Sequence, residues 1–272
     1  MSHSGVPTAD LPDDEKAKRS GSFGEVASLY ERYRPGPPIA AVEWMLPEGC
    51  ASVADLGAGT GALTRLLVDR VGEVIAVEPD DRMREVLGEQ VPGARPVAGR
   101  GDAMPLPDNS VNAVLASSSW HWMDVVPTLH EVARVLTPGG TLGAVWSGPD
   151  PDAAFMAQAR AMMAPGAAAS QGALAAAVAD ESNRPPSGLI IPDGLPFDPP
   201  EEETFRFDVA LTADDIIGLL ATFSWIITLS EEQREKIYAD ARRLMREFLG
   251  LEGDATTDVG FRADTYRTRC RA

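Results

Sequence analysis

Short apolar runs alternate with amphipathic segments through the first half of the chain. Runs of three to six mostly apolar residues predict buried strands at 52–55, 74–77, 96–98, 111–116 and 141–146. Between them, apolar residues recur at helical spacing over 63–67, 80–91 and 129–136, and Pro138-Gly139-Gly140 ends the last of these segments. A strand and a helix in units of about 30 residues are typical of a doubly wound, mostly parallel α/β sheet.

The same pattern divides the chain into four parts. Residues 1–20 are rich in Ser, Pro and Asp and predict a mobile tail, whereas residues 21–150 hold the strand–helix alternation. Residues 151–200 are first Ala- and Met-rich and then Pro-rich, which predicts a helical cap or lid. Residues 201–272 are expected to complete the sheet and the substrate pocket. In this last part we predict strands at 204–209 and 259–269 and helices at 212–220 and 230–249.

Charge narrows the range of partners. The 272 residues include 24 Lys and Arg against 41 Asp and Glu, which gives a formal net charge of −17. The lysines are only Lys16, Lys18 and Lys236, and no basic run exceeds two residues. Because phosphate contacts need clustered Lys and Arg, we expect neither a nucleic acid nor a membrane as a partner. A small-molecule substrate is favoured, and the oligomeric state does not follow from the sequence.

Cysteine and histidine are scarce. Cys50 and Cys270 lie far apart, and His3, His121 and His130 form no HExxH motif. A disulfide framework and a metal site are therefore not expected. The polar N-terminus has no apolar core of a secretory signal, and no apolar stretch is long enough to span a bilayer. A cytoplasmic protein is the resulting expectation.

The strongest motif follows the first predicted strand. It reads Asp55-Leu-Gly57-Ala-Gly59-Thr-Gly61, and Glu78 ends the second strand. Glycines permit a sharp turn from strand to helix and let a ligand lie against bare backbone. An acid at the end of the second strand can accept both hydroxyls of a ribose. The spacing Gly57-x-Gly59-x-x-Ala62 also satisfies a dinucleotide fingerprint, so that NAD is an alternative ligand.

Three further features favour a different nucleoside ligand. Asp55 precedes the first glycine by two residues, where it could hold an amino-acid ammonium group. Asp102 follows the third strand and suits the exocyclic amine of adenine. Tyr30, Tyr33 and Arg34 precede the glycine loop. A ligand with adenine, ribose and an amino-acid tail would use all of these groups, whereas NAD has no such tail.

The chain resembles the class I S-adenosylmethionine-dependent methyltransferases. The glycine loop, Val74-Ile-Ala-Val-Glu-Pro-Asp80, Gly101-Asp-Ala-Met-Pro-Leu-Pro-Asp-Asn-Ser110 and Leu136-Thr-Pro-Gly-Gly-Thr-Leu142 stand in that family's order over about residues 25–147. Tyr33-Arg34-Pro35 and Trp120-His-Trp-Met-Asp124 are similar to small-molecule enzymes of the trans-aconitate methyltransferase type. The resemblance implies a Rossmann-like fold of seven strands, with the last strand antiparallel.

The resemblance also implies a role for each matching residue. Gly57, Gly59 and Gly61 would line the methionyl part of S-adenosylmethionine, with Asp55 near its ammonium group. Glu78 would take the ribose hydroxyls. The remaining predicted cofactor residues are Pro79, Asp80 and Met83 beside the adenine, Asp102 and Ala103 at its amine, Ser117 below the methionyl group, and Arg34 at its carboxylate. Asp80 could equally cap the helix that follows it.

His121 is the histidine predicted at the carboxyl end of a strand, where ligands of open sheets collect. It is the candidate catalytic base for removing a proton from an acceptor hydroxyl. Alternatively, Trp120, His121 and Trp122 form a packed wall of the substrate pocket, to which Tyr30 and Tyr33 would also contribute. The wall is the favoured interpretation.

The function expected from these residues is methyl transfer from S-adenosylmethionine to a small molecule, most readily to a hydroxyl or carboxylate oxygen. The product of the cofactor would be S-adenosylhomocysteine. In-line displacement on an activated carbon needs alignment more than a covalent nucleophile. Two alternatives stay open at this point: an NAD(P)-dependent oxidoreductase, and a protein of this fold that binds a ligand or catalyses another reaction, such as a cyclisation.

Overall fold

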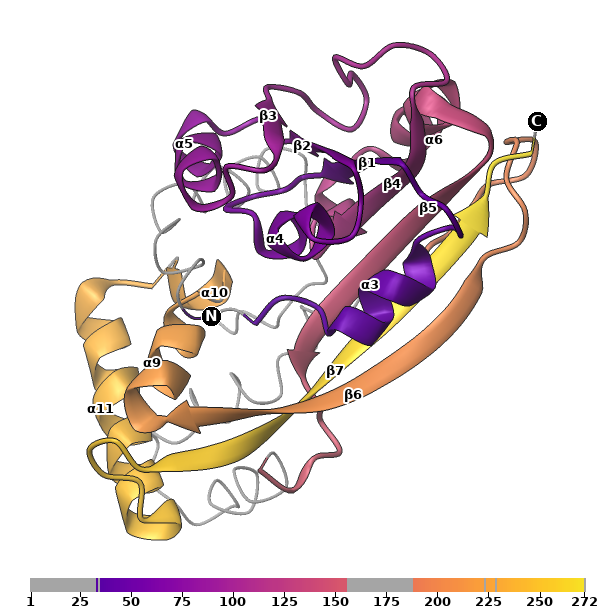
Figure 1. The fold of residues 1–272 in the computed structure, drawn as a ribbon. Helices are drawn as coiled ribbons and strands as arrows, with labels where there is room; N and C mark the ends of the chain where they lie inside the picture. The colour runs from indigo at the N-terminus through magenta and orange to yellow at the C-terminus, as the bar shows by residue number, and fades with distance from the viewer. Residues whose placement is uncertain (1–32, 34, 156–187, 223, 228, 272) are drawn as a thin grey trace.

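One seven-stranded sheet organises the molecule (Figure 1). The computed structural model describes residues 33, 35–155, 188–222, 224–227 and 229–271. The strand order is β3-β2-β1-β4-β5-β7-β6. The strands are β1 Ser52–Leu56, β2 Glu73–Val77, β3 Arg95–Val97, β4 Val111–Ser117, β5 Leu136–Pro149, β6 Glu201–Thr212 and β7 Thr256–Arg269. β1 to β5 pair in parallel and β7 is antiparallel to both β5 and β6, which confirms the predicted mostly parallel, Rossmann-like sheet.

The helices cover both faces of the parallel strands. On one face, α3 Ile39–Met45 and α4 Ala62–Val68 pack their apolar residues against β1, β4 and β5, and α5 Asp81–Gln90 places Leu87 against Ala76 of β2. On the other face lies α6 Val125–Val135, preceded by the 3-10 turn η3 Trp120–Trp122. Because both faces are covered, β1 and β2 are buried along nearly their whole length.

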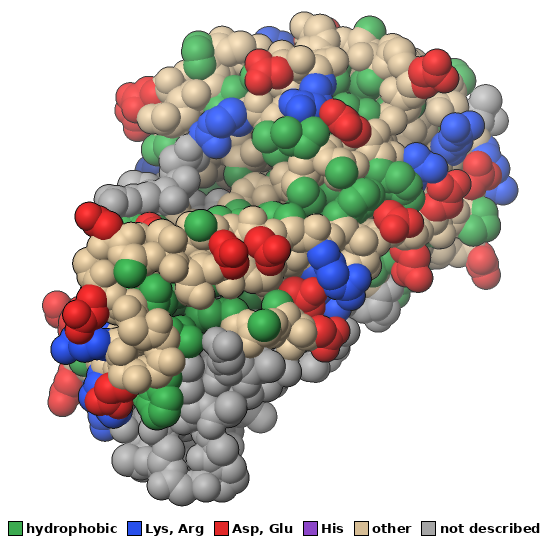
Figure 2. Space-filling model, turned by 60° about the horizontal axis from the view of Figure 1, so that its bottom comes forward, with side chains coloured by type: hydrophobic (Ala, Val, Ile, Leu, Met, Phe, Trp, Pro, Cys, Tyr) green, Lys and Arg blue, Asp and Glu red, His purple; other side chains and the backbone are tan. Residues whose placement is uncertain are grey.

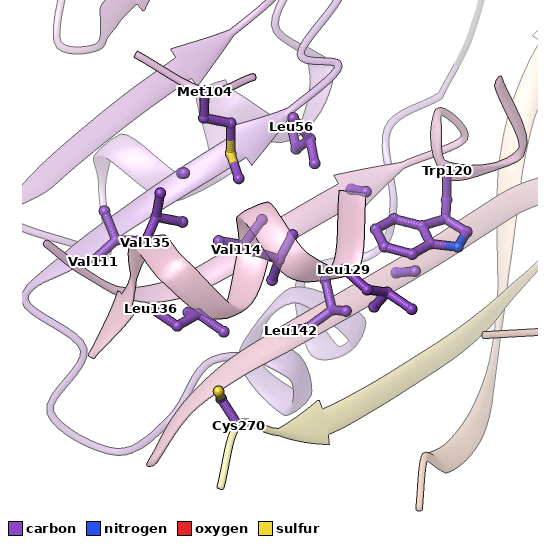
Figure 3. Packing of buried hydrophobic residues seen from close by; sticks show 14 of the residues in the cluster. Leu56, Met104, Val111, Val114, Trp120, Leu129, Val135, Leu136, Leu142 and Cys270 are labelled. Carbon is purple, nitrogen blue, oxygen red and sulfur yellow. The ribbon is translucent and has the colours of Figure 1, made fainter. Parts of the chain in front are cut away.

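The α6 face holds the largest apolar cluster. Figure 3 shows Trp120 beside Leu129 of α6 and Leu142 of β5. Leu189, Leu195 and Phe197 close the same cluster from the segment before β6. The segment before β6 thus helps α6 to cover the face of the sheet on which η3 lies.

The C-terminal part adds a second apolar cluster at the far end of β6 and β7 (Figure 1). Three helices form it: α9 Ala213–Ala221, α10 Ser224–Ile227 and α11 Glu231–Leu249. Capping boxes begin α9 at Thr212 and α11 at Ser230, because each hydroxyl accepts from the backbone N–H three residues later. The helices predicted in this part are therefore present, with boundaries set by these caps.

Both C-terminal strands are longer than their apolar patterns predicted. β6 pairs with β7 from Glu201 to Thr212, whereas apolar alternation indicated only 204–209. The additional residues at its start are three exposed glutamates, which pair through the backbone and give no apolar signal. Charged side chains on an outer strand also discourage pairing with another molecule. The predicted tail at 1–20 and most of the predicted cap at 151–200 lie outside the described residues.

Among the helices that the structure describes, none combines the length and the apolar character needed to cross a membrane.

The packing under α6 makes a stability prediction. Leu129 is fully buried, whereas Val126 on the same helix is 45% exposed. Leu129→Ala should lower the free energy of unfolding by about 2–5 kcal/mol, because it leaves a cavity between α6 and the sheet. Val126→Ala should change it by no more than about 0.5 kcal/mol. Urea unfolding of the two variants measures both values, and equal effects would contradict this packing.

Candidate functional site

A tight loop joins β1 to α4 at the carboxyl end of the sheet. Gly57, Gly59 and Gly61 have φ angles of 69°, 58° and 97°, a region that favours glycine. The N–H groups of Gly57 and Ala58 both donate to the carbonyl of Val77, at 2.8 and 3.2 Å, and so fasten the loop to the end of β2. A Cβ at Gly59 would meet Met83 Sδ at 3.9 Å and no other described atom within 4 Å. The backbone at Gly59 therefore faces open space.

Glu78 ties this loop to the next one. Its side chain directly follows β2, and the residue is only 6% exposed. One carboxylate oxygen accepts from the N–H of Gly59 and the other from the N–H of Asp80, each at 2.9 Å. Burial raises the pKa of Glu78, and these two backbone donors oppose that rise. Glu78, the residue predicted to bind the ribose hydroxyls, thus connects both loops through its carboxylate.

Asp80 caps α5. Its carboxylate accepts from the backbone N–H groups of Arg82 and Met83 and also pairs with the Arg82 side chain, whose hydrogen bond lowers the pKa of Asp80. The structure thus supports the cap interpretation for the side chain. Met83 is buried and lies beside the Gly59 backbone, whereas Pro79 is exposed. Met83 therefore lies beside the glycine loop, and the contact of Pro79 and Met83 with an adenine stays a prediction.

Asp55 is a buried acid with one satisfied oxygen. Its Oδ2 accepts from the Thr64 hydroxyl at 2.6 Å, whereas Oδ1 has no hydrogen-bond partner among the described residues. Burial is the main cause that raises the pKa of Asp55 to about 7, and the nearby Glu78 raises it further. A positive group beside Oδ1 would favour the ionised carboxylate. Asp55 is therefore prepared for a cationic or hydrogen-bond-donating partner.

The loop after β3 presents Asp102 and Ala103 to solvent. Arg100 and Ala103 exchange backbone hydrogen bonds across a tight turn, and the Arg100 side chain pairs with Asp102, which lowers the pKa of Asp102. Beyond the turn, α6 clamps the chain. Glu131 accepts from the N–H of Met104 at 2.8 Å, and Arg134 donates to the carbonyls of Met104 and Leu106.

This clamp was not predicted, because its residues lie on a helix more than 20 positions away from the loop they hold. The Arg134–Glu131 pair on the polar face of α6 would have been a signal for it.

The three serines at the end of β4 have different roles. Ser117 ends β4 and is half-buried, and Ser118 has a positive φ of 50°, which turns the chain. Ser119 then donates from its hydroxyl to the carbonyl of Leu56 at 2.7 Å and packs on the glycine loop, where a Cβ at Gly57 would stand 2.6 Å from the Cβ of Ser119. The residue that touches the loop is therefore Ser119, which was not predicted, and the place of Ser117 below the methionyl group stays a prediction. The run of three serines was the available signal.

Two residues beyond Ser119, His121 lies in η3 between two tryptophans. Trp120 is 4% exposed and belongs to the apolar core shown in Figure 3, whereas His121 and Trp122 are half-buried. The His121 and Trp122 rings are 4.8 Å apart, and the indole N–H of Trp146 donates to His121 Nδ1 at 3.1 Å. Trp146 of β5 was missed, because no sequence spacing connects it with His121.

Tyr33 links the segment before the sheet to the C-terminal helices. Its ring lies directly against Gly218 of α9, so that a Cβ at Gly218 would overlap it. Of the other residues predicted in this segment, Tyr30 and Arg34 lie outside the described residues. The structure thus brings Tyr33 into contact with the second apolar cluster.

Two arginine–aspartate pairs extend the site past Trp146. Trp146 and Asp264 are partners across β5 and β7, and Asp264 binds Arg262 through both carboxylate oxygens. Arg206 of β6 stands opposite Arg262 and donates to the buried Asp150 at 2.9 Å. Each guanidinium is paired with a carboxylate, and Asp152 adds a further negative charge near Arg262, so this end of the sheet is polar. Within the described parts of the chain, no group of three or more His, Cys, Asp or Glu side chains could hold a metal ion.

Several known proteins are similar to this chain in sequence or in fold. Residues 54–144 match the family model of a methyltransferase domain. An uncharacterised methyltransferase of Mycobacterium tuberculosis is 35% identical over 224 residues, which cover 82% of this chain and 85% of the relative. The chain belongs to the S-adenosylmethionine-dependent methyltransferases. This membership decides against the oxidoreductase alternative.

Two further comparisons add detail. The malonyl-[acyl-carrier protein] O-methyltransferase of Methylococcus capsulatus is 33% identical over 147 residues, about half of each chain (50% and 53%). A solved structure from Anaeromyxobacter dehalogenans, assigned to the type II methyltransferases, has a TM-score of 0.57 at 20% identity and covers 88% of this chain and 98% of that one. This second likeness shows the fold. The narrower resemblance to trans-aconitate methyltransferases stays a prediction.

The described residues of this methyltransferase fit S-adenosylmethionine. The Oδ1 atom of Asp55 is buried without a partner among those residues, which suits an ammonium group, and the Gly59 backbone faces open space. Glu78 lies at the end of β2, where an acid can accept ribose hydroxyls. Gly59 and Glu78 are joined by a hydrogen bond, and Asp55 lies near Glu78 at the end of β1, so that one ligand can reach all three.

The open face of the glycine loop can be tested by filling it. Gly59→Ala should weaken S-adenosylhomocysteine binding at least tenfold, because the methyl group occupies the space over the loop. Gly49→Ala is the matched control, since Gly49 has a φ of 69° and open surroundings but lies before β1, so that both variants carry similar backbone strain. Calorimetric titration measures the affinities, and an equal loss in both variants would contradict the assignment.

The raised pKa of Asp55 predicts how stability depends on pH. Between its ordinary value of 3.8 and about 7, the folded protein holds a proton on Asp55 that the unfolded chain releases. The free energy of unfolding should therefore fall as the pH rises through this window, by up to about 1.4 kcal/mol per pH unit, and level off above about 7.

Asp55→Asn should lack this component, whereas the exposed Asp69→Asn should follow the wild type. Urea unfolding at pH 5, 6, 7 and 8 gives the comparison. Parallel curves for wild type and Asp55→Asn would show that the folded state does not raise the pKa of this acid.

Proposed function

We propose that this methyltransferase transfers the methyl group to an oxygen of a small molecule, a hydroxyl or a carboxylate. The observation that carries the proposal is the position of η3. Ser119 packs on the glycine loop, and the half-buried His121 and Trp122 follow it directly. An aromatic and polar surface beside the cofactor loop suits a compact acceptor, which it can contact on several sides.

The surface supports a small acceptor over a nucleic acid. On the face that Figure 2 presents, the Lys and Arg side chains are interspersed with Asp and Glu and form no continuous basic band. The chain as a whole carries a formal charge of −17. A polyanion would be repelled by this excess of carboxylates, whereas a small acceptor beside η3 is exposed mainly to local groups.

The choice of oxygen has support from one relative. The enzyme of Methylococcus capsulatus, which matches about half of this chain, is named as an O-methyltransferase acting on malonyl-[acyl-carrier protein]. Because the likeness covers only about half of each chain, it supports the reaction class more than a particular acceptor.

The described residues contribute mainly by placing the reactants. When bound, S-adenosylmethionine supplies a methyl group already activated on a sulfonium sulfur. The glycine loop, Glu78 and Asp55 are held by hydrogen bonds before any ligand arrives, and such preorganised placement lowers the entropy cost of alignment. The buried ring of Trp120 packs in the apolar cluster and excludes water from the side of η3 that faces the sheet.

The proposal is tested with a panel of acceptors. Purified protein is incubated with S-adenosylmethionine and small carboxylic acids, alcohols, phenols, amines or RNA, and S-adenosylhomocysteine and methylated products are measured by mass spectrometry. We expect turnover with at least one oxygen acceptor. Methylation confined to amines or to RNA would contradict the proposal.

Two variants show whether turnover depends on the described site. Glu78→Gln removes the charge that both loop N–H groups use, and should lower the affinity for S-adenosylmethionine by about 10- to 100-fold. Glu73→Gln lies at the exposed start of the same strand and should leave the affinity unchanged. Equal affinities in the two variants would show that Glu78 does not contribute to cofactor binding, and would contradict the assignment of this site.

A further inference from the structure

Trp146 fixes the hydrogen-bonding state of His121. The residue is 5% exposed, and its ring packs edge-on against Tyr266 of β7 with centroids 5.8 Å apart. From this position the indole Nε1 lies 3.1 Å from His121 Nδ1. The ring of His121 is also held by Trp122 at 4.8 Å. The two rings that flank the imidazole therefore define its orientation.

The chemistry of the donor decides the tautomer. An indole N–H can only donate, so His121 Nδ1 must accept through its lone pair. A neutral imidazole carries one N–H, and with Nδ1 as the acceptor the proton is on Nε2. Nε2 then has no lone pair with which to take a proton. If Nδ1 became protonated instead, it would oppose the indole N–H with a second donor.

The charged groups around this pair do not reverse the argument. Asp264 is opposite Trp146 across the sheet and is bound by Arg262 through both oxygens. Asp150, near the end of β5, is bound by Arg206. Asp124, the residue that precedes α6, is the nearest acid in sequence to His121. Asp264 and Asp150 are each bound by an arginine, Asp152 lies near Arg262, and no hydrogen bond described for Asp124 reaches the imidazole.

We propose that Trp146 is a positioning residue that holds His121 as an Nε2–H donor, and that His121 binds the acceptor oxygen through this donor without taking a proton from it. The proposal rests on the proposed function for the acceptor, but the tautomer is a property of the protein alone. His121 thereby changes from the candidate base of the sequence to a group that orients the acceptor. An acceptor whose oxygen is already ionised needs no base, so this histidine has only to donate a hydrogen bond to it.

The tautomer can be measured without any substrate. Long-range proton–nitrogen correlation spectra of protein labelled with ¹⁵N-histidine distinguish the two neutral forms by the nitrogen that bears the proton. The chain has three histidines, so the His121 signal is assigned by its loss in His121→Gln. We expect wild-type His121 to carry its proton on Nε2 at neutral pH. A neutral ring with the proton on Nδ1, or a doubly protonated ring, would overturn the proposal.

Trp146→Phe keeps an aromatic ring in the core but removes the indole N–H. In this variant we expect the Nδ1–H form to become populated. An unchanged spectrum from a folded variant would show that Trp146 does not set the tautomer. Should this variant fail to fold, the wild-type spectrum alone still decides whether Nδ1 accepts a hydrogen bond.

Turnover of an acceptor found in the panel separates donor from base. The amide of His121→Gln can reach about as far as Nε2 and donate, whereas His121→Asn reaches only as far as Nδ1. We expect Gln to retain kcat/KM within about threefold and Asn to lower it by about tenfold, the effect of one lost hydrogen bond.

A loss of about 10²–10⁴-fold in kcat with both variants would identify a base and overturn the proposal. Unchanged turnover in the Asn variant would also overturn it. If no acceptor is turned over, the proposed function fails, while the spectra still report the tautomer.

Discussion

The carboxylate of Glu78 holds together the two loops on which the cofactor half of the site depends. It is buried at the end of β2, and its two oxygens accept from the backbone N–H groups of Gly59 and Asp80. One of these loops opens α4 and the other opens α5. A single acid therefore sets the spacing of two helix N-termini. Charge-assisted hydrogen bonds of this kind are about twice as strong as neutral ones, which suits a loop that contains three glycines.

Two buried acids so close together oppose stability. Burial raises the pKa values of both Glu78 and Asp55. The nearby Glu78 adds to the rise for Asp55, whose pKa reaches about 7. Thr64 satisfies one oxygen of Asp55, whereas the other has no hydrogen-bond partner among the described residues. A core that served only folding would place an apolar residue here. The retained charge is explained by a ligand that brings its own donors, as an ammonium group and ribose hydroxyls do.

The sequence was most informative where its signals are local. The glycines after β1, the acids at the ends of β1 and β2, and the apolar runs of β1 to β5 predicted a mostly parallel sheet with a cofactor loop after its first strand. It was least informative where a contact joins distant residues. Nothing in the spacing of His121 and Trp146 indicates their hydrogen bond, and Arg134 reaches the Met104 loop across the end of α6. The contact of Ser119 with the glycine loop was not predicted, because it depends on the backbone turn at Ser118.

The same contrast between local signals and distant contacts separates the cofactor side of the site from its proposed acceptor side. Groups for the cofactor lie on consecutive loops, so that their spacing along the chain carries the information. The described contact of η3 with the sheet comes from Trp146 of β5, which packs against Tyr266 of the antiparallel β7, far from it in the sequence. Tyr33 against Gly218 and Trp146 against Tyr266 are contacts of this kind. If the proposed acceptor side lies at η3, substitutions around Trp146 and Tyr266 can change its shape while the loops that hold the cofactor stay intact. A fold built in this way can keep one methyl donor and accommodate many acceptors.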